Sequence, residues 1–388
     1  MNPLPQTTNR FSIPFRWDVF WKKQRVLFTE TGFFRPLPAL LFHLGLYGTN
    51  QIGWGLDGIL PSTIRTPQLD NSVFIVGHQR SGTTFLHRLL YQNEWAHSLQ
   101  LQEMLFPSNT LQECIGIVNR MDSTLGGNIR KWFQQIQERT FADLDKIHRV
   151  RFDEPEEDEL VMWAIYASDM CINDNPTLIE MGLEGMPKTF EHWSKKHQQS
   201  ALMWYRSCVH KKIQRTNGDG LYVGKNPRFS RCLPLLDNTF PNSKIIVLIR
   251  NPIEAIVSRM SLMKAIWTHR NPNFGELSPN HVQWILNNSI ETYLQTEKGL
   301  KTIPEHRKIV IGYNALKATP RLTVQKIQRH FEFPEYTPSL MTELSRLEEQ
   351  PYRSKHQYDL QQFGLHESQI REPLAEVFSR YHTLLNSE

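Results

Sequence analysis

VFIVGHQRSGTTFLHRLLYQN, residues 73–93, contains the change of periodicity that decides the fold. Val73–Val76 is a continuous apolar run rich in β-branched residues, which predicts a buried strand. A loop bounded by Gly77 and Gly82 follows, and Thr84–Asn93 then has the period of a helix. Loop N–H groups that converge at a helix N-terminus attract anions, so this order of elements predicts a cradle for a phosphate group.

The loop has the G-x-x-x-x-G spacing of nucleotide-hydrolysing proteins but lacks their lysine. In those proteins a lysine follows the second glycine and reaches the β- and γ-phosphates. Here Thr83 follows Gly82, and the positive side chain is Arg80, inside the loop. This difference argues against an ATPase or a GTPase. A plain glycine turn between strand and helix, without a ligand, is the alternative.

Three further apolar runs predict strands: Leu221–Val223, Ile245–Ile249 and Ile309–Ile311. Stretches with a helical period lie between the strands, among them Glu156–Met170 and Ile253–Lys264. Buried strands that alternate with helices predict an α/β fold, a three-layer sandwich like that of the P-loop NTPases, with a central, mostly parallel sheet. We expect a helical N-terminal segment, residues 1–70, that packs on the core, and a main domain, residues 71–388, with a helical insertion at about 95–215.

A second group of polar residues follows the strand at 245–249. Arg250-Asn251-Pro252 stands at its carboxyl end, where open α/β sheets bind ligands, and Ser258 lies about two turns into the next helix. An arginine fork and a serine hydroxyl suit a phosphate. Taken alone, Arg-Asn-Pro is equally typical of a surface turn.

Together, HQRSGTT (78–84) and IIVLIRNPIEAIVSRMS (245–261) resemble the sulfotransferase superfamily. The resemblance extends over roughly residues 71–375, and is nearest to the group with a Pro-Arg-Ser-Gly-Thr-Thr loop, which includes bacterial enzymes and the tyrosylprotein sulfotransferases. It implies an enzyme that transfers a sulfuryl group from 3′-phosphoadenosine 5′-phosphosulfate (PAPS) to an acceptor hydroxyl and releases 3′,5′-ADP, without a metal.

The resemblance also implies roles for individual residues. Arg80 would neutralise charge on the transferring group, and Lys225 would lie near the leaving oxygen. Arg250 and Ser258 would hold the 3′-phosphate, and Tyr313 would lie beside the adenine, unless it is a core tyrosine at a strand end. The 5′-phosphosulfate would lie on the backbone of Ser81, Gly82, Thr83 and Thr84.

The catalytic base is not given by the resemblance to the cytosolic enzymes. Those enzymes have a histidine two residues after the lysine, where this chain has Pro227, and the Arg-Lys-Gly segment that they use near the 3′-phosphate is missing too. Glu103 is the first candidate, because the tyrosylprotein and bacterial groups have a glutamate at a similar distance after the loop. His148 is the second, since its pKa suits proton transfer near neutral pH.

Composition limits the remaining classes of function. The 388 residues carry a net charge of +5 without a basic block, which gives no reason to expect nucleic-acid binding. The four cysteines match no zinc pattern and the N-terminus shows no signal peptide, so we expect a cytoplasmic protein. The acidic run 153–159 predicts a helix start rather than a metal site.

The N-terminal region and the insertion are rich in aromatic residues. Residues 15–59 predict either helices packed on the core or peripheral contact with a membrane. In the insertion, aromatic residues suggest a hydrophobic or lipid-like alcohol as acceptor, unless they belong to the core: Trp132, Phe133, Phe141, Trp163 and Tyr166. A P-loop kinase and a non-catalytic protein that binds PAPS or 3′,5′-ADP remain as alternative functions.

Overall fold

The structure is a computed structural model, and its chain forms two compact units. The first unit comprises residues 1–67 and 99–218, and the second comprises residues 68–98 and 219–388. The expected packing of residues 1–70 on the core of the main domain stays a prediction. The structure describes residues 12–32, 36–59, 69, 72–141, 150–173, 175–180, 190–216, 219–271, 273–349 and 359–386.

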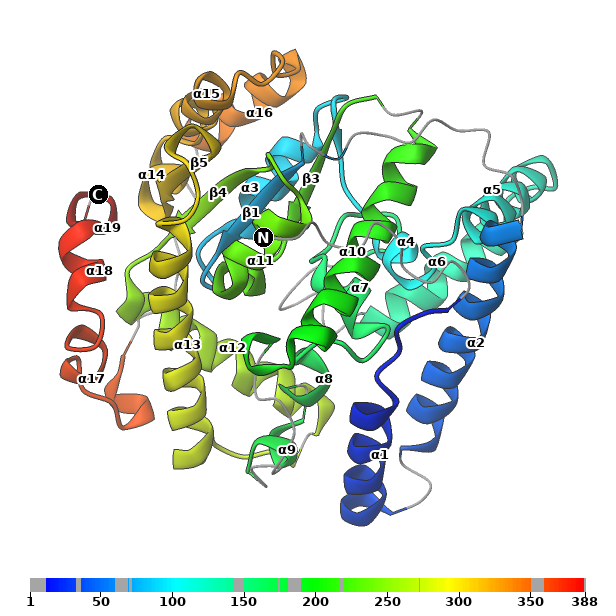
Figure 1. The fold of residues 1–388 in the computed structure, drawn as a ribbon, viewed down its shortest axis with the longest axis horizontal. Coiled ribbons are helices and arrows are strands. Elements are labelled where there is room, and N and C mark those ends of the chain that lie inside the picture. The colour runs from blue at the N-terminus through cyan, green and yellow to red at the C-terminus, as the bar shows by residue number, and fades with distance from the viewer. Residues whose placement is uncertain are drawn as a thin grey trace. The chain divides into compact units, whose positions relative to one another are not determined.

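A five-stranded, entirely parallel sheet forms the centre of the second unit, which confirms the predicted fold class. Its order is β2-β3-β1-β4-β5, and Figure 1 labels the last four of these strands. The four predicted strands extend one or two residues beyond the predicted ends, and the two-residue β2 was not predicted. The strands are β1 (Val73–Gly77), β2 (Ala96–His97), β3 (Leu221–Lys225), β4 (Lys244–Ile249) and β5 (Lys308–Gly312).

The register of the sheet aligns the carboxyl ends of four adjacent strands. Ile75 of β1 is opposite Lys225 of β3, and Gly77 of β1 is opposite Leu248 of β4. Ile249, at the end of β4, is opposite Gly312, at the end of β5. The segments that follow these strands therefore leave the sheet at one edge.

Helices cover both faces of the sheet, as in the predicted three-layer sandwich. Alternate residues of the strands, such as Val73 and Ile246, form one apolar cluster with α3 (Thr83–Tyr91), α14 (Tyr313–Ala318), α15 (Pro320–Phe331) and α16 (Pro338–Glu349). On the other face, the ring of Phe74 lies 6.4 Å from that of Phe229 and 4.8 Å from that of Phe240. This face carries the 3₁₀ helix η3 (Pro227–Cys232), α11 (Leu233–Thr239), α13 (Pro279–Leu300) and α18 (Ala375–Arg380).

The remaining helices of the second unit continue these layers. The long helix after β4 extends beyond the predicted Ile253–Lys264 at both ends. Pro252 begins it, and Asn251 caps its start through a bond from the Ile253 N–H. These helices are α12 (Pro252–Arg270), η4 (Glu305–Arg307), η5 (Gln361–Phe363), α17 (Ser368–Arg371) and α19 (His382–Asn386).

The described part of the first unit is helical, apart from loops. Its core forms around α10, where Trp204, Tyr205 and Cys208 are buried and the ring of Trp54 lies 4.5 Å from that of Trp204. The helices are α1 (Trp17–Thr31), α2 (Leu37–Ile59), α4 (Leu101–Leu105), α5 (Asn109–Thr124), α6 (Asn128–Phe141), α7 (Glu159–Trp163), α8 (Met170–Asn173), α9 (Pro176–Glu180), η2 (Phe190–His192) and α10 (Lys195–Arg215).

The helix predicted at Glu156–Met170 is wrong. α7 spans five residues and ends before Tyr166, whose φ of 58° is left-handed and cannot continue an α-helix. The acidic run does not cap α7 either. Asp158 precedes α7, but its carboxylate makes no capping bond and accepts a hydrogen bond from the Tyr205 hydroxyl. Tyr166 is buried, whereas Trp132 and Phe133 are exposed.

Candidate nucleotide site

The loop after β1 begins at a glycine that no other residue can replace without displacement of the backbone. Gly77 has a φ of 140°, and a Cβ atom there would lie 2.2 Å from the Leu248 carbonyl oxygen. Ser230 Oγ accepts a hydrogen bond from the Gly77 N–H at 2.8 Å and lies 3.0 Å from the Gly77 carbonyl oxygen. Strand β4 and η3 thus fix the start of the loop.

The middle of the loop places the Arg80 side chain at the surface. Arg80 has a φ of 70°, a conformation that costs about 1–2 kcal/mol for a residue with a Cβ. Such strain persists where surrounding contacts hold it and where function needs it. Here Arg250 Nη1 donates to the Arg80 carbonyl oxygen at 2.9 Å. The arginine inside the loop is therefore held by the arginine of the second motif.

The loop ends at an open helix N-terminus. Gly82 is the N-cap residue of α3 and has a φ of 87°. Because glycine has no side chain, the N-cap residue makes no side-chain hydrogen bond to the first turn. A Cβ at Gly82 would lie 3.0 Å from Cδ2 of Tyr313, so the glycine also lets that ring approach the loop. Backbone N–H groups of the first helical turn, beside a glycine that keeps space clear, form an anion site.

Arg80 and Arg250 connect the loop to the second motif. Arg80 Nε donates to Ser258 Oγ at 3.0 Å. Arg250 Nε and Nη2 donate to Glu254 Oε2 at 3.2 and 2.9 Å, and its guanidinium lies 4.3 Å from the centre of the Tyr313 ring. Four of the predicted residues, Arg80, Arg250, Ser258 and Tyr313, thus form one continuous group.

Lys225 joins this edge from the neighbouring strand. It is the last residue of β3, is 1% exposed, and its Nζ donates to Thr84 Oγ1 at 3.1 Å. Because Thr84 is in the first turn of α3, the ammonium group lies at the helix N-terminus where an anion would bind. Its burial shows that Lys225 is not an exposed surface lysine.

Several supporting residues were not predicted. The His78 ring stacks on the Tyr293 ring, with 5.0 Å between centres and 11° between planes, and the Tyr293 hydroxyl donates to the Arg250 carbonyl oxygen at 3.0 Å. Burial and then the Arg259 guanidinium lower the pKa of His78 to about 3, so the ring is neutral, and its Nδ1 lies 2.5 Å from the Gln79 carbonyl oxygen. Glu254 had a local signal, its i,i+4 spacing from Arg250. Tyr293, 43 residues away, had none.

Glu103, the first candidate for the base, belongs to the first unit. Its carboxylate accepts a hydrogen bond from the Gln100 N–H and pairs with Lys212 Nζ and Arg215 Nη2, each at 2.9 Å. Burial favours the protonated form, but Lys212 and Arg215 outweigh burial and hold the pKa of Glu103 below its ordinary value. The carboxylate is thus ionised, as a base must be. Its role in proton transfer stays a prediction, and His148 lies outside the described residues.

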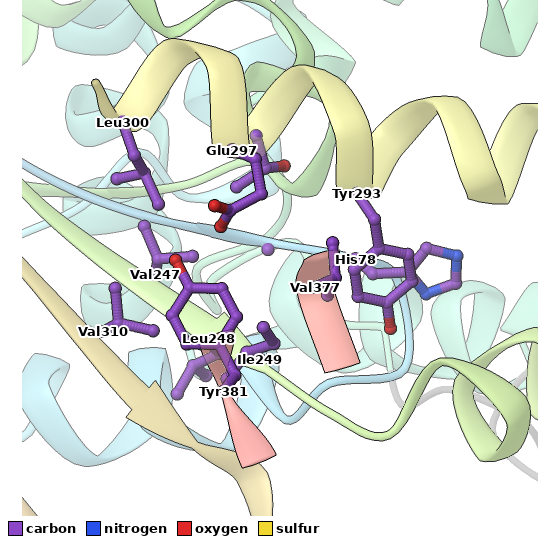
Figure 2. A pocket seen from close by; sticks show the side chains of 12 residues that line it. His78, Val247, Leu248, Ile249, Tyr293, Glu297, Leu300, Val310, Val377 and Tyr381 are labelled. Carbon is purple, nitrogen blue, oxygen red and sulfur yellow. The ribbon is translucent and has the colours of Figure 1, made fainter. Parts of the chain in front are cut away.

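A small pocket lies beneath the loop, on the face of the sheet that α13 and α18 cover (Figure 2). Gly77 and His78 reach it, but none of the cationic residues described above lines it. At its polar end Tyr381 is hydrogen-bonded to Glu297, and Glu297 pairs with Arg380 at 3.0 Å. We interpret this pocket as an interior gap between layers, separate from the nucleotide site.

No group of three or more His, Cys, Asp and Glu side chains among the described residues could hold a metal ion. No helix among them is long and apolar enough to cross a membrane.

An all-parallel sheet with a glycine-bounded loop, two arginines and a buried lysine at one edge has the arrangement typical of α/β proteins that bind nucleotide phosphates. The model of the sulfotransferase family matches residues 72–338, more than half of the chain. The chain therefore belongs to the sulfotransferase family, which confirms the resemblance and the predicted enzyme class.

Relatives agree with this assignment. The omega-hydroxy-beta-dihydromenaquinone-9 sulfotransferases Stf3 of Mycobacterium bovis and Mycobacterium tuberculosis are each 24% identical in an alignment of 291 positions that covers 70% of this chain. The match spans 66% of the length of these curated relatives, slightly less than two thirds.

Solved structures share the fold. Sulfotransferase STF1 from Mycobacterium tuberculosis H37Rv superposes with a TM-score of 0.64 at 16% identity, over 96% of this chain and 94% of that one. Sulfotransferase STF9 from Mycobacterium avium gives a TM-score of 0.55 at 16% identity, over 96% and 87%.

Proposed function

We propose that this chain transfers the sulfuryl group of PAPS to an acceptor hydroxyl and releases 3′,5′-ADP. The observation that carries the proposal is the hydrogen bond between Arg80 and Ser258, which joins two anion-binding elements. One element is the loop and N-terminus of α3, and the other consists of Arg250, directly after β4, and Ser258, on α12. Two adjacent anion positions suit a nucleotide with phosphates at both its 3′ and 5′ positions, whereas ATP carries its phosphates in one chain.

The reaction would be an in-line displacement at sulfur. The acceptor oxygen forms a bond to sulfur, while the bond between sulfur and the bridging oxygen of the 5′-phosphate breaks. Arg80, exposed in the loop, stabilises charge on the sulfuryl oxygens, and Lys225, at the N-terminus of α3, stabilises charge on the bridging oxygen. The proton of the hydroxyl passes to a base, for which Glu103 is the candidate.

The acceptor we propose is a hydrophobic or lipid-like alcohol. The relatives at 24% identity are named for a lipid-like omega-hydroxy compound, a dihydromenaquinone. Exposed aromatic side chains in this chain, such as Trp132 and Phe133, are consistent with an apolar acceptor.

Calorimetric titration of 3′,5′-ADP, with 5′-AMP as control and Mg²⁺ removed, tests the donor. We expect micromolar binding of 3′,5′-ADP and much weaker binding of 5′-AMP. Ser258→Ala should lower the affinity for 3′,5′-ADP and leave that for 5′-AMP unchanged, since it removes a group proposed to bind only the 3′-phosphate. Arg329→Ala, an exposed arginine on α15, is the matched control. Mg²⁺-dependent binding that favours ATP would replace the proposal with a kinase.

Transfer to an alcohol, measured with PAPS, separates an enzyme from a binding protein. Glu103→Gln should retain 3′,5′-ADP binding and lose transfer, because a carboxamide cannot accept the hydroxyl proton. Unchanged transfer by a folded Glu103→Gln protein would exclude Glu103 as the base. A wild-type protein that binds 3′,5′-ADP but transfers to none of the alcohols would be a non-catalytic binder.

A further inference from the structure

α5 and α6 form a helical hairpin whose apolar side chains face solvent. On α5 the exposed apolar residues occupy positions i, i+1, i+4 and i+8, which fall within about 100° of the helix surface. They are Ile117, Val118 and Met121, together with Leu125, the C-cap residue that directly follows the last turn of α5. On α6 a stripe of similar width consists of Ile129, Trp132, Phe133 and Ile136. We call these eight residues the hairpin surface.

The hairpin is anchored by its other side. Asp122, 5% exposed, accepts hydrogen bonds from the Ile129 and Arg130 N–H groups at 2.9 and 2.8 Å and so caps the start of α6. Gln137 is buried and its Oε1 accepts from the Phe152 N–H at 2.9 Å. Because these polar contacts fix the hairpin, the outward position of the apolar stripes belongs to the folded state.

The hairpin surface is basic at its margins. Arg120, Arg130 and Lys131 are exposed, and Asp122 is the one acidic residue between 117 and 136. Since the Asp122 carboxylate is buried as a cap, the charge presented to solvent by this stretch is positive. Exposed Leu, Ile and Trp beside exposed Lys and Arg is the composition of helices that lie in the interface of an anionic bilayer.

Helix α2, which packs beside α5, also presents an uncharged face (Figure 1). Asp57 is the one Asp, Glu, Lys or Arg in its 23 residues, and its carboxylate is turned to the start of α5, where it accepts from the Asn109 and Thr110 N–H groups. Leu41, Ile52 and Ile59 are all more than half exposed.

We propose that the hairpin surface inserts into the surface of a membrane that contains anionic lipids. A second copy of the chain is a poorer partner, because a two-fold contact would place the same three positive side chains of each copy against one another. This inference goes beyond the proposed function, and it concerns the first unit. Its test needs no PAPS, so it can fail or succeed independently of sulfuryl transfer.

Flotation with vesicles tests the proposal. The full-length protein, without nucleotide, is mixed with phosphatidylcholine vesicles that contain about 30% phosphatidylglycerol or none. We expect binding to the anionic vesicles and weaker binding to the neutral ones. The variant Leu125→Asp/Trp132→Asp alters two of the most exposed residues of the hairpin surface, 73% and 61%, so the fold should persist. Its binding should be about tenfold weaker or worse.

Two further variants sharpen the result. Leu322→Asp changes a leucine of α15 that is 58% exposed and should bind vesicles as wild type does. Arg130→Gln/Lys131→Gln should weaken binding to anionic vesicles several-fold and leave binding to neutral ones unchanged. Absence of vesicle binding by wild type, or equal losses for the hairpin variant and Leu322→Asp, would overturn the proposal. So would a wild-type dimer that the hairpin variant dissociates, because the hairpin surface would then be an interface between copies.

Discussion

Arg80 combines a strained backbone with a side chain that reaches solvent, and its charge can be tested apart from its strain. Arg80→Lys and Arg80→Gln carry the same cost of a positive φ as the native residue, so a comparison of the two isolates the charge. We expect kcat with PAPS to fall about 10²–10³-fold for Arg80→Gln, as for the loss of an oxyanion donor. Arg80→Lys should retain part of that rate. Equal rates for the two variants would show that the charge does not act in the transition state.

The Glu254 carboxylate contacts the Arg250 guanidinium, which we propose binds the 3′-phosphate. It accepts from both Nε and Nη2 of Arg250, and a phosphate would have to share or displace it. Glu254→Gln removes a negative charge from this position, so we expect 3′,5′-ADP to bind about fivefold more tightly by calorimetry. Glu276→Gln, which alters an exposed pair with Lys264, should leave affinity unchanged. Weaker binding by Glu254→Gln would instead mean that Glu254 orients Arg250.

At the scale of residues, the sequence predicted best those site residues that stand together in short motifs of polar side chains. Arg80, Ser258, Arg250 and Tyr313 come from two short motifs and one strand end, and the structure brings them together. Ser230 and Tyr293 support the same edge from 153 and 43 residues away. Such contacts depend on tertiary packing, and a single sequence carries no local signal for them.

At the scale of elements, hydrophobic periodicity predicted strands correctly where they are regular. It predicted a helix wrongly where the backbone conformation of one residue ends the helix. The strand at 73–77 is apolar throughout, the strand at 244–249 is apolar after Lys244, and both were predicted within one residue. The stretch 156–170 has a helical pattern of apolar residues, but Tyr166 adopts a left-handed φ and divides it. Strand β2 is too short for a two-residue alternation to be visible.

Asp57 shows how one element can fix another. From the sequence it has no context beyond that of a loop residue. In the structure it lies in α2, accepts from the Asn109 and Thr110 N–H groups at the start of α5, and pairs with Lys211 at 2.6 Å. Asp57→Ala would leave the Lys211 ammonium, 14% exposed, without its partner, so we expect a loss of about 3 kcal/mol in the free energy of unfolding.

Urea denaturation of this variant needs two comparisons. Asp57→Ala/Lys211→Met should recover part of the loss, because it removes the unpaired charge too. Glu367→Ala, which breaks an ion pair with Arg371 in which both side chains are more than half exposed, should change stability by about 0.5 kcal/mol or less. Similar effects of Asp57→Ala and Glu367→Ala would contradict a structural role for the Asp57 contact.

For the whole molecule, the burial of His78 beside the candidate nucleotide site should lower the free energy of unfolding at mildly acidic pH. His78 has a pKa of about 3 in the folded protein against an ordinary value of 6.5, because it is buried and lies near Arg259. Below pH 6.5 the unfolded chain therefore binds a proton that the folded chain does not. The contribution of His78 to stability is complete above pH 6.5 and is lost progressively as the pH falls toward 3.

His78→Asn tests this linkage, because an amide can donate to the Gln79 carbonyl as Nδ1–H does but cannot take up a proton. Between pH 6.5 and 5, His78 alone should cost wild type about 2 kcal/mol of unfolding free energy, measured by urea denaturation at both values. His78→Asn should be less stable at pH 7 through loss of the stacking on Tyr293, yet its stability should fall less on acidification. His306→Asn, at an exposed histidine of η4, should follow wild type at both pH values. Equal losses of unfolding free energy in wild type and His78→Asn would mean that the His78 ring takes up its proton within the folded protein. The conclusion that a neutral His78 ring supports the loop would then be wrong.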